Sequence, residues 1–420
     1  MKHPLPHPTS EFHLKSLIAA VASALLCTLS FAALPAQAQA FSILHSFTNG
    51  GDGGSPTAPV TIDSAGNLYG TASTGGTGGN GTVFELKRSD NGWTLNTLHA
   101  FDYSNGDGKV PLSGVVFGPD GALYGTTSAG GTGCYGGCGT VYNLRPPQTF
   151  CHTGVCLWTE TIIHNFAGYP HDGLQPEYAT PIFDPSGNLY GTTCGGGPVD
   201  DGTAFEMSES NGTWTETPIH NFTGGDGECP QVGLLRDRAG NLYGTTLQGT
   251  GNQGEVFELT LLASGWTLSK LVVFEEGING NAPGGPLVAD SAGNLYGMTQ
   301  SGSVFELTYS GGTWAYNQIF DLPGAGGIGP LAMDAEGNLY GTQFVGGIFG
   351  SGAVFKLTLG NGTWAYTDMH DFSITNGCAF PYSGVSIDVD GNLYGTASQG
   401  GYRAPSCGYW GCGCVWKITP

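Results

Sequence analysis

Short runs of alternating and β-branched apolar residues fill most of the chain, and Gly, Asn and Asp interrupt them. In the first complete unit the runs are 58–63, 67–72, 81–87 and 93–101. Alternation over such lengths, bounded by turn-forming residues, predicts β-strands. We name these four predicted strands A, B, C and D in chain order. Because glycine recurs too often for long helices to form, the pattern predicts an all-β protein.

The strand B phrase GNLYGT returns through the whole chain with small changes. Its seven tyrosines are Tyr69, Tyr124, Tyr190, Tyr243, Tyr296, Tyr340 and Tyr394. They follow one another at intervals of 44 to 66 residues, which is the spacing of a repeat architecture. A four-stranded antiparallel unit repeated seven times predicts a seven-bladed β-propeller.

The two ends of the repeat array complement each other. Residues 41–47 have the pattern of a D strand with no A, B or C before it, and the last unit stops after its C strand at 414–418. A closed ring would pair these two segments and leave no open sheet edge. We therefore expect 41–47 to be the fourth strand of the last blade. A linear β-solenoid is the alternative, but it does not account for the complementary ends.

The phrase and strand D also predict which side chains share a face. In strand B, Tyr and Thr are expected on one face and Leu and Gly on the other, with the glycine removing bulk where a neighbouring blade approaches. In strand D, period two places Trp93, His99 and Phe101 on one face and Leu98 on the other.

An aspartate stands three residues before the phrase in six units. These residues are Asp63, Asp184, Asp237, Asp290, Asp334 and Asp388. Aspartate at the head of a turn can accept hydrogen bonds from the backbone just after it. Calcium ligation is the alternative, but one aspartate in each separate hairpin cannot converge on one ion. We therefore predict turn residues here.

Polar residues also recur around the end of strand D. The histidines are His45, His99, His164, His220 and His370, and the loops that follow contribute Asp52, Asp107, Asp172 and Asp226. One histidine in each repeat, far from the ring axis, cannot gather around a single site. We therefore expect half-buried structural histidines and solvated turn aspartates rather than metal or catalytic groups. No metal and no cofactor is predicted.

The first forty residues differ from the rest. Lys2 and Lys15 precede an apolar stretch, and AQA at 38–40 is a small-x-small cleavage site. We expect a signal peptide at 1–40 and a single propeller domain at 41–420, with an uncleaved membrane anchor as the alternative. After cleavage no membrane insertion is expected. The location predicted is secreted, periplasmic or at the cell surface.

Charge excludes some partners. Without Lys2, Lys15 and Glu11 the chain has 10 basic and 32 acidic residues, a net charge of −22. Nucleic acid and anionic membrane surfaces would be repelled, so neither is an expected partner. A monomer is expected.

Ten cysteines remain beyond residue 40. In an exported chain an even number favours disulfides over zinc thiolates, and the spacings lack the paired C-x2-C of a zinc site. Three pairs are expected because both cysteines of each lie in one short loop, and the four remaining cysteines give two more pairs. The expected pairs are Cys151–Cys156, Cys134–Cys138, Cys407–Cys412, Cys194–Cys229 and Cys378–Cys414.

The phrase order GNLYGTTxxGG, GTVFEL, W and LHxF resembles the GloVer tandem repeats of exported bacterial proteins. The resemblance covers nearly all of residues 41–420. The shorter pattern D-x-x-G-N-L-Y is also similar, more weakly, to NHL-type propeller blades. The GloVer resemblance implies an exported repeat protein, and it brings no catalytic residue to any position of this sequence.

Candidate ligand-binding residues lie in the two longest loops between strands B and C, in units 2 and 7. In a ring these units flank unit 1, whose own B–C loop is short and rich in glycine. We expect Tyr135 on one side, and Tyr402, Tyr409 and Trp410 on the other, to form two walls of a groove for a sugar chain or a peptide. The alternative is that these rings only cover their own disulfides.

No catalytic motif accompanies these loops, since both G-x-S-x-G and H-E-x-x-H are absent from the sequence. The favoured function is a non-catalytic extracellular binding or scaffolding module with a glycan or protein ligand. Two alternatives stay open. One is a carbohydrate-active or other hydrolytic enzyme that uses loop carboxylates, and the other is a structural component of the cell surface.

Overall fold

The computed structural model describes residues 39–147, 158–275, 282–324, 329–375, 377–401 and 405–420. The predicted signal peptide lies almost entirely outside the described residues. The predicted Cys151–Cys156 bond and Tyr402 also lie outside them.

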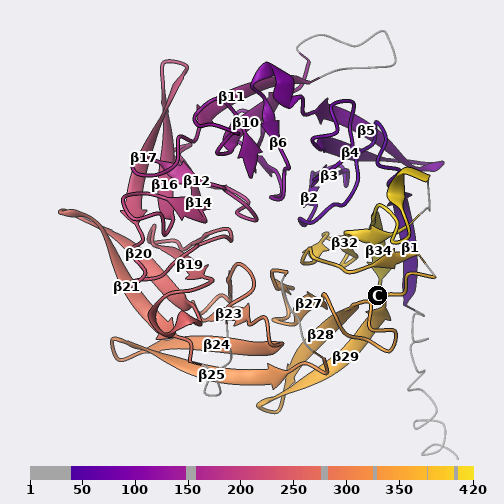
Figure 1. The fold of residues 1–420 in the computed structure, drawn as a ribbon. Helices are drawn as coiled ribbons and strands as arrows, with labels where there is room; N and C mark the ends of the chain where they lie inside the picture. Colours follow the sequence, from indigo (N-terminus) through magenta and orange to yellow (C-terminus); the bar gives the residue numbers. More distant parts are fainter. Residues whose placement is uncertain (1–38, 148–157, 276–281, 325–328, 376, 402–404) are drawn as a thin grey trace, which may run out of the picture. The chain divides into compact units, whose positions relative to one another are not determined.

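Residues 41–419 form one compact unit. Within it, seven four-stranded antiparallel sheets follow one another around a ring, each with strand A innermost and strand D outermost (Figure 1). The described residues contain no α-helix. The prediction of an all-β, seven-bladed propeller is confirmed.

The two inner strands of each blade differ in length. The A strands are β2 Thr61–Ile62, β7 Val116–Phe117, β13 Ile182–Phe183, β18 Leu235–Arg236, β22 Val288–Ala289, β26 Ala332–Met333 and β31 Ser386–Ile387. The B strands are β3 Leu68–Ala72, β8 Leu123–Thr127, β14 Leu189–Thr193, β19 Leu242–Thr246, β23 Leu295–Met298, β27 Leu339–Gln343 and β32 Leu393–Ala397. Strand A is therefore much shorter than the six residues of its sequence pattern.

The two outer strands are longer and form the wall of the ring. The C strands are β4 Thr82–Ser89, β10 Thr140–Arg145, β16 Thr203–Ser210, β20 Glu255–Leu262, β24 Ser303–Ser310, β28 Ala353–Gly360 and β34 Cys414–Thr419. The D strands are β5 Gly92–Ala100, β11 Thr159–Asn165, β17 Thr213–Asn221, β21 Gly265–Val273, β25 Thr313–Asp321, β29 Thr363–Asp371 and β1 Ala40–Ser46.

The ring closes through its N-terminal strand. The sheet of blade 7 has the order β1-β34-β32-β31, so β1 is its outer strand, as the sequence predicts. Further hydrogen bonds join this blade to blade 1. Thr396 Oγ1 donates to the carbonyl of Ala58 (3.0 Å), and Ser386 Oγ donates to that of Val60 (2.6 Å).

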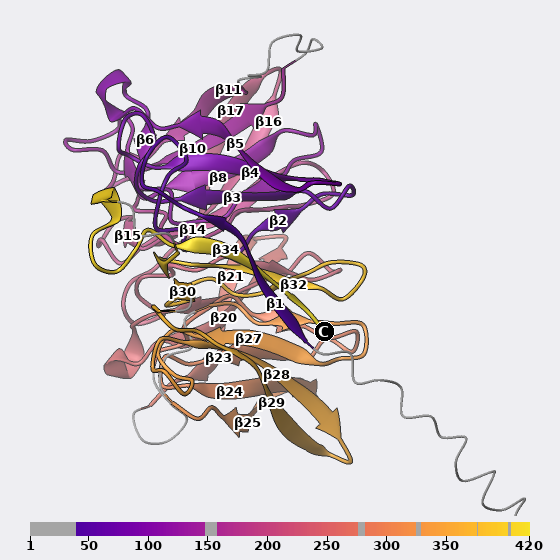
Figure 2. The same ribbon diagram turned by 90° about the vertical axis from the view of Figure 1, so that its right-hand side faces the viewer.

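The D–A and B–C connections lie together on one face of the ring, which we call the loop face. In three blades a small two-stranded sheet pairs the D–A connection with the B–C connection. These small sheets lie on the left side of Figure 2. They are β6 Gly108–Lys109 with β9 Ala129–Gly130, β12 Gly173–Leu174 with β15 Gly195–Gly196, and β30 Cys378–Ala379 with β33 Gln399–Gly400. Short 3-10 turns also occur here, at η1 Tyr103–Asn105, η2 Thr250–Asn252 and η3 Pro405–Cys407.

The core consists of seven clusters, each between two neighbouring blades. The phrase tyrosine points to the next blade, where Tyr69 packs on Phe117 with ring centroids 5.1 Å apart. The phrase leucine points to the preceding blade, where Leu68 shares a cluster with Tyr394. The phrase threonine bonds the next blade, since Thr71 Oγ1 donates to a backbone carbonyl there at 2.7 Å. Each part of the phrase therefore joins one blade to another.

The phrase glycine has a different role from the one predicted. Gly70 is the cross-strand partner of Phe84 in the same blade. A Cβ on Gly70 would lie 2.6 Å from Cζ of the Phe84 ring. The missing side chain makes room for the blade's own aromatic residue in strand C, not for a neighbouring blade.

The predicted faces of strand D are also wrong. Trp93 and Leu95 pack between blades 7 and 1, whereas Leu98 and Phe101 pack between blades 1 and 2. A β-bulge is the cause, because Val83 pairs with His99 while the next residue of its strand pairs with Thr97. The extra residue in strand D changes the face of everything after it.

The turn aspartates act as predicted. Asp63 Oδ1 accepts the backbone N–H groups of Ala65 (2.9 Å) and Asn67 (2.8 Å), and Oδ2 accepts the amide of Asn67 (2.8 Å). The bond to the phrase asparagine's N–H recurs at the other five. Each of these carboxylates is held within its own hairpin.

Candidate functional site

Two disulfide-closed loops project from the loop face, as the sequence analysis expected. Cys134–Cys138 closes the loop of blade 2, and Cys407–Cys412 closes that of blade 7. Tyr135 is 107% exposed, Tyr409 71% and Trp410 50%. The three described rings therefore extend into solvent rather than being buried against the disulfides.

The two loops are anchored over different interfaces. The Cys407–Cys412 bridge packs into the core between blades 7 and 1, and the Cys134–Cys138 bridge packs into the core between blades 2 and 3. Tyr409 and Trp410 contact each other, with ring centroids 5.2 Å apart. The groove expected over blade 1 stays a prediction, because Tyr402, which belongs to one of its walls, lies outside the described residues.

A row of aromatic side chains leads from Trp410 to the central axis of the propeller. Trp410 meets Phe380 at 6.3 Å, Phe380 meets Phe344 at 5.2 Å, and Phe344 meets Tyr382 at 4.3 Å between centroids. Tyr382 then stacks on Tyr178, at 6.3 Å with the two planes 7° apart. We call these six residues the aromatic row: Tyr178, Phe344, Phe380, Tyr382, Tyr409 and Trp410. Except for Tyr178, all belong to loops of blades 6 and 7.

The inner end of the row lines the axial channel. A pocket lies there, bordered by residues that precede strand A in all seven blades. Its lining is Thr57, Ala58, Pro59, Leu112, Tyr178, Thr180, Gln231, Val232, Gly284, Pro286, Pro330 and Tyr382. None of these side chains carries a carboxylate, an amine or an imidazole. The channel mouth is therefore uncharged and largely apolar.

Two other features adjoin the row. The blade 6 loop that carries Phe344 also exposes Val345, Ile348 and Phe349, so apolar surface continues outward from the row. Glu177 precedes Tyr178 in the chain, and burial raises the pKa of its carboxyl. Burial, followed by the neighbouring Tyr382 and Glu177, raises the pKa of Tyr178 to about 12.

A second group of polar residues lies between blades, toward the outside of the ring. Four D-strand histidines bond the aspartate of the following loop through Nε2 and Oδ2. The pairs are His45–Asp52 (3.1 Å), His99–Asp107 (2.9 Å), His164–Asp172 (3.1 Å) and His220–Asp226 (3.1 Å). The histidines are half-buried as predicted, and each packs edge-on against a phenylalanine.

The prediction that these aspartates are solvated turn residues is wrong. Their side chains are 11% to 29% exposed. Each loop folds back so that the carboxylate bonds the histidine and also accepts a backbone N–H. Asp107 Oδ2, for example, accepts the N–H of Asp102 at 2.9 Å. The fifth histidine differs, because His370 stacks on Phe41 at 3.7 Å and burial lowers its pKa.

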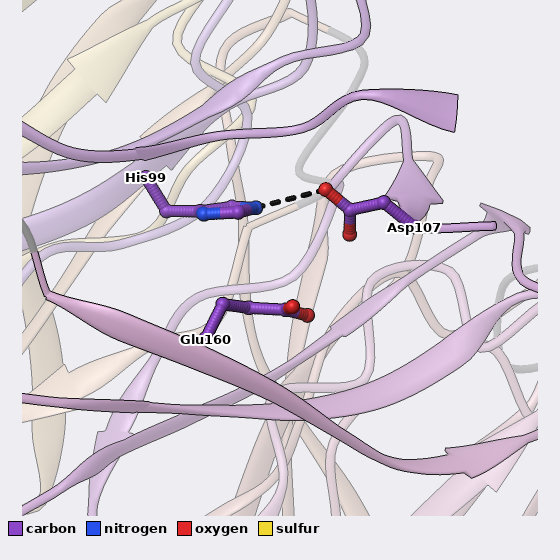
Figure 3. A group of neighbouring side chains, drawn as sticks. All are labelled: His99, Asp107 and Glu160. Carbon is purple, nitrogen blue, oxygen red and sulfur yellow. Dashed lines mark hydrogen bonds and ion pairs between the residues drawn. The ribbon is translucent and has the colours of Figure 1, made fainter. Parts of the chain in front are cut away.

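A glutamate from the next blade joins two of the four pairs. Glu160 of β11 lies beside His99 and Asp107 (Figure 3), and Glu216 of β17 lies beside His164 and Asp172. In each group, ligand atoms of the three side chains lie within 4.8 Å of one another. We call these groups the two His–Asp–Glu trios.

The trios concentrate negative charge in partly buried places. Burial, followed by the charge of Asp107, raises the pKa of Glu160 to about 7. Burial and the charge of Asp172 raise the pKa of Glu216 in the same way, also to about 7. Burial alone would raise the pKa of Asp172 as well, but hydrogen bonds from His164 and from backbone N–H groups outweigh it and lower that pKa.

Sequence reasoning missed the trios, although a signal was present. Glu160 and Glu216 each stand two residues after the strand D tryptophan, where the other units have Leu95, Leu268, Tyr316 and Tyr366. A carboxylate at a repeat position that is otherwise leucine or tyrosine indicates a local role different from core packing. The contact itself crosses between units and is not encoded in the pattern of either.

Comparison with known families settles what kind of chain this is. The model of the Gloeobacter/Verrucomicrobia repeat matches residues 30–157 and again 153–306, which together are well over half of the sequence. The chain belongs to the Gloeobacter/Verrucomicrobia repeat family. The resemblance to GloVer repeats is thereby confirmed. Among curated proteins none matches the sequence.

Solved structures that are similar to this family member have low sequence identity to it. The extracellular domain of a hybrid two-component system protein from B. thetaiotaomicron is 12% identical with a TM-score of 0.50, covering 90% of this chain and 41% of that one. An ulvan polysaccharide lyase is 12% identical with a TM-score of 0.49, covering 87% and 91%. A gluconolactonase from Xanthomonas campestris is 14% identical with a TM-score of 0.42, covering 72% and 84%. The likeness to the first of these, with its TM-score of 0.50, shows a shared fold and nothing about activity. Across the described residues, no helix has the length and apolar character needed to span a membrane.

Proposed function

We propose that this protein is an extracellular, non-catalytic binding module whose aromatic row holds a neutral glycan chain. The observation that carries the proposal is the continuity of the row from the exposed Trp410 to the channel mouth at Tyr178. Sugar rings present C–H faces that stack on aromatic side chains, and a row of such faces suits a chain of sugars. Contiguous apolar surface marks an interaction site, and the exposed Val345, Ile348 and Phe349 add to the row on the same loop as Phe344.

Charge and lining support a neutral ligand and binding without hydrolysis. The net charge of −22 beyond residue 40 disfavours polyanionic glycans. Hydrolysis of glycosidic bonds generally uses a pair of carboxyl groups at the bond. The uncharged channel lining offers no such pair. Four disulfides among the described residues support a location in an oxidising compartment outside the cytoplasm.

Substitution of Trp410 tests the proposal. A panel of neutral polysaccharides would be screened by affinity electrophoresis, and hits would be measured by calorimetry with oligosaccharides. We expect Trp410→Ala to weaken binding roughly tenfold, or about 1.4 kcal/mol, with little change in melting temperature. Tyr309→Ala is the matched control, because Tyr309 is also exposed but lies in the C–D hairpin of blade 5.

Two results would overturn the proposal. One is an unchanged affinity in Trp410→Ala for every polysaccharide that binds. The other is the release of reducing ends or unsaturated sugars from a bound polysaccharide, which would indicate an enzyme. Binding of peptides but of no polysaccharide would assign the row to a protein ligand instead.

A further inference from the structure

The two His–Asp–Glu trios repeat one arrangement at adjacent blade interfaces. In each, a D-strand histidine and a loop aspartate come from one side of the interface, and the glutamate comes from the D strand of the next blade. The residues are His99, Asp107 and Glu160 in one trio, and His164, Asp172 and Glu216 in the other. Figure 3 shows the Glu160 carboxylate lying alongside the His99–Asp107 pair.

One carboxylate oxygen of each half-buried glutamate lacks a hydrogen-bond partner. Oε1 of Glu160 and Oε1 of Glu216 are both shielded from solvent and accept no hydrogen bond. In each trio a ligand oxygen of the glutamate lies within 4.8 Å of a second carboxylate oxygen and of one imidazole nitrogen. Burying such charge without compensation is costly. A cation bound at this position would be favoured.

The other interfaces show that packing does not require a glutamate here. Beside the His45–Asp52 and His220–Asp226 pairs, the same position is taken by Leu95 and Leu268, and both leucines pack into the core. The repeat accepts an apolar residue at this place and gains burial from it. Glutamate occurs at this position beside two of the four His–Asp pairs, and there it adds a third possible ligand.

We propose that each trio is a binding site for one divalent transition-metal ion, of which zinc is the representative. Imidazole nitrogen together with carboxylate oxygens suits such ions, whereas Ca²⁺ and Mg²⁺ prefer oxygen ligands alone. The His Nε2 to Asp Oδ2 separations of 2.9 and 3.1 Å are close to those between neighbouring ligand atoms around an ion about 2.1 Å from each. Three protein ligands leave coordination positions open for water.

The aspartates are oriented for this role by the backbone. Asp107 Oδ1 accepts the N–H of Gly108 at 2.6 Å, and Asp172 Oδ1 accepts that of Gly173 at 2.6 Å. Asp172 Oδ2 also accepts the N–H of Ala167 at 2.7 Å. Hydrogen bonds of this kind fix a metal-binding carboxylate and tune its basicity. The inference is independent of the glycan proposal, because the trios and the aromatic row share no residue.

Zinc titration of the chelator-treated protein tests the inference. Calorimetry should give two equivalents of zinc for each chain, and zinc should raise the melting temperature. Glu160→Leu and Glu216→Leu should each remove one equivalent, and the double variant should remove both along with the thermal shift. Leucine is chosen because Leu95 and Leu268 occupy the same place in blades 1 and 4. Glu160→Gln keeps the shape of the side chain and should also lose its equivalent.

His220→Phe is the matched control, since this histidine has an aspartate but no glutamate beside it. We expect it to leave the two equivalents intact. The inference is overturned if the wild-type protein binds no zinc, or if the double glutamate variant still binds two equivalents. It is also overturned if millimolar calcium displaces the zinc, because that would indicate an oxygen-only site elsewhere.

Discussion

Each position of the blade occurs seven times, so a departure from the repeat can be weighed against six internal controls. The aromatic residue of strand C is phenylalanine in five blades, tryptophan in blade 7 and Tyr142 in blade 2. The Tyr142 side chain is fully buried, and its hydroxyl has no hydrogen-bond partner. Burial, together with the charges of Glu160 and Asp107, raises the pKa of this hydroxyl. Blade 2 therefore carries an unsatisfied polar group that its neighbours avoid.

Replacing Tyr142 by Phe should stabilise the protein. An unpartnered buried hydroxyl costs about 1–3 kcal/mol, and phenylalanine fits this place in most other blades. We expect the free energy of unfolding to rise by about 1 kcal/mol in denaturant titrations. Tyr124→Phe is the matched control and should lower it by a similar amount, because the Tyr124 hydroxyl bonds Asp120 at 3.1 Å. A loss of stability in Tyr142→Phe equal to that of the control would contradict the prediction.

At the same scale, some side-chain roles followed from the sequence and others did not. The turn aspartates could be predicted because donor and acceptor lie within four residues of each other. The His99–Asp107 pair is nearly as local, yet it depends on how the loop folds back, which composition does not indicate. Glu160 meets His99 across 61 residues of chain, and only the stagger between two blades brings them together.

At the scale of the element, the number and order of the strands followed from alternation, but their faces did not. Period two holds only while pairing is regular, and a bulge in strand D shifts it. The register shift at Val83/Phe84 recurs in each of the five blades that follow. Because a bulge removes no apolar residue from the pattern, the sequence gives no warning of it. The wrong assignment of faces to Trp93 and Phe101 therefore applies equally to strand D of the other five blades.

The disulfides also belong to this scale, because they tie loops rather than blades. Cys194–Cys229 joins the B–C loop of blade 3 to the connection entering blade 4, at a sequence separation of 35. Cys134–Cys138 spans only four. All four described pairs coincide with those expected from the sequence. Closing a longer segment restricts the unfolded chain more.

Removing the long bridge should therefore cost more than removing the short one. Loop-closure entropy gives about 4 kcal/mol for the Cys194/Cys229→Ala double variant and about 2 kcal/mol for Cys134/Cys138→Ala. Equilibrium unfolding of both variants, each measured against the oxidised wild type, checks the order. If the short bridge proved the more stabilising of the two, chain entropy would not be the main contribution of these bonds.

At the scale of the whole ring, the proposed activities occupy different sectors. The aromatic row lies on the loop face of blades 6 and 7 and reaches the channel. The trios lie between blades 1, 2 and 3, where their histidines and glutamates belong to the outer strands β5, β11 and β17. Because each blade interface has its own core cluster, a substitution at one interface can change its chemistry without repacking the others. A repeat scaffold of this kind carries new sites at low structural cost.

The ring closes within blade 7, where no turn of the chain joins strand β1 to the neighbouring strand β34. In blade 7, strand β1 comes from the start of the ring and the other three strands from its end. The strand runs into Phe47, which is fully buried and packs on Phe84 at 5.3 Å between centroids. Phe222 holds the equivalent place at the end of strand D in blade 3, also fully buried, on Phe257 at 5.2 Å. The closing interface thus matches an ordinary one in packing.

Equal packing predicts equal energy. Phe47→Ala and Phe222→Ala should each lower the free energy of unfolding by about 3–5 kcal/mol and agree within about 1 kcal/mol. Deleting residues 41–47 should cost more than either, because it also exposes the edge of β34 and removes the stacking of Phe41 on His370. Denaturant unfolding of the three variants gives the comparison, and a synthetic peptide of residues 41–47 should restore part of the loss. A deletion that unfolds at an unchanged midpoint would mean that closure contributes nothing to stability, and Phe47→Ala should then be silent as well.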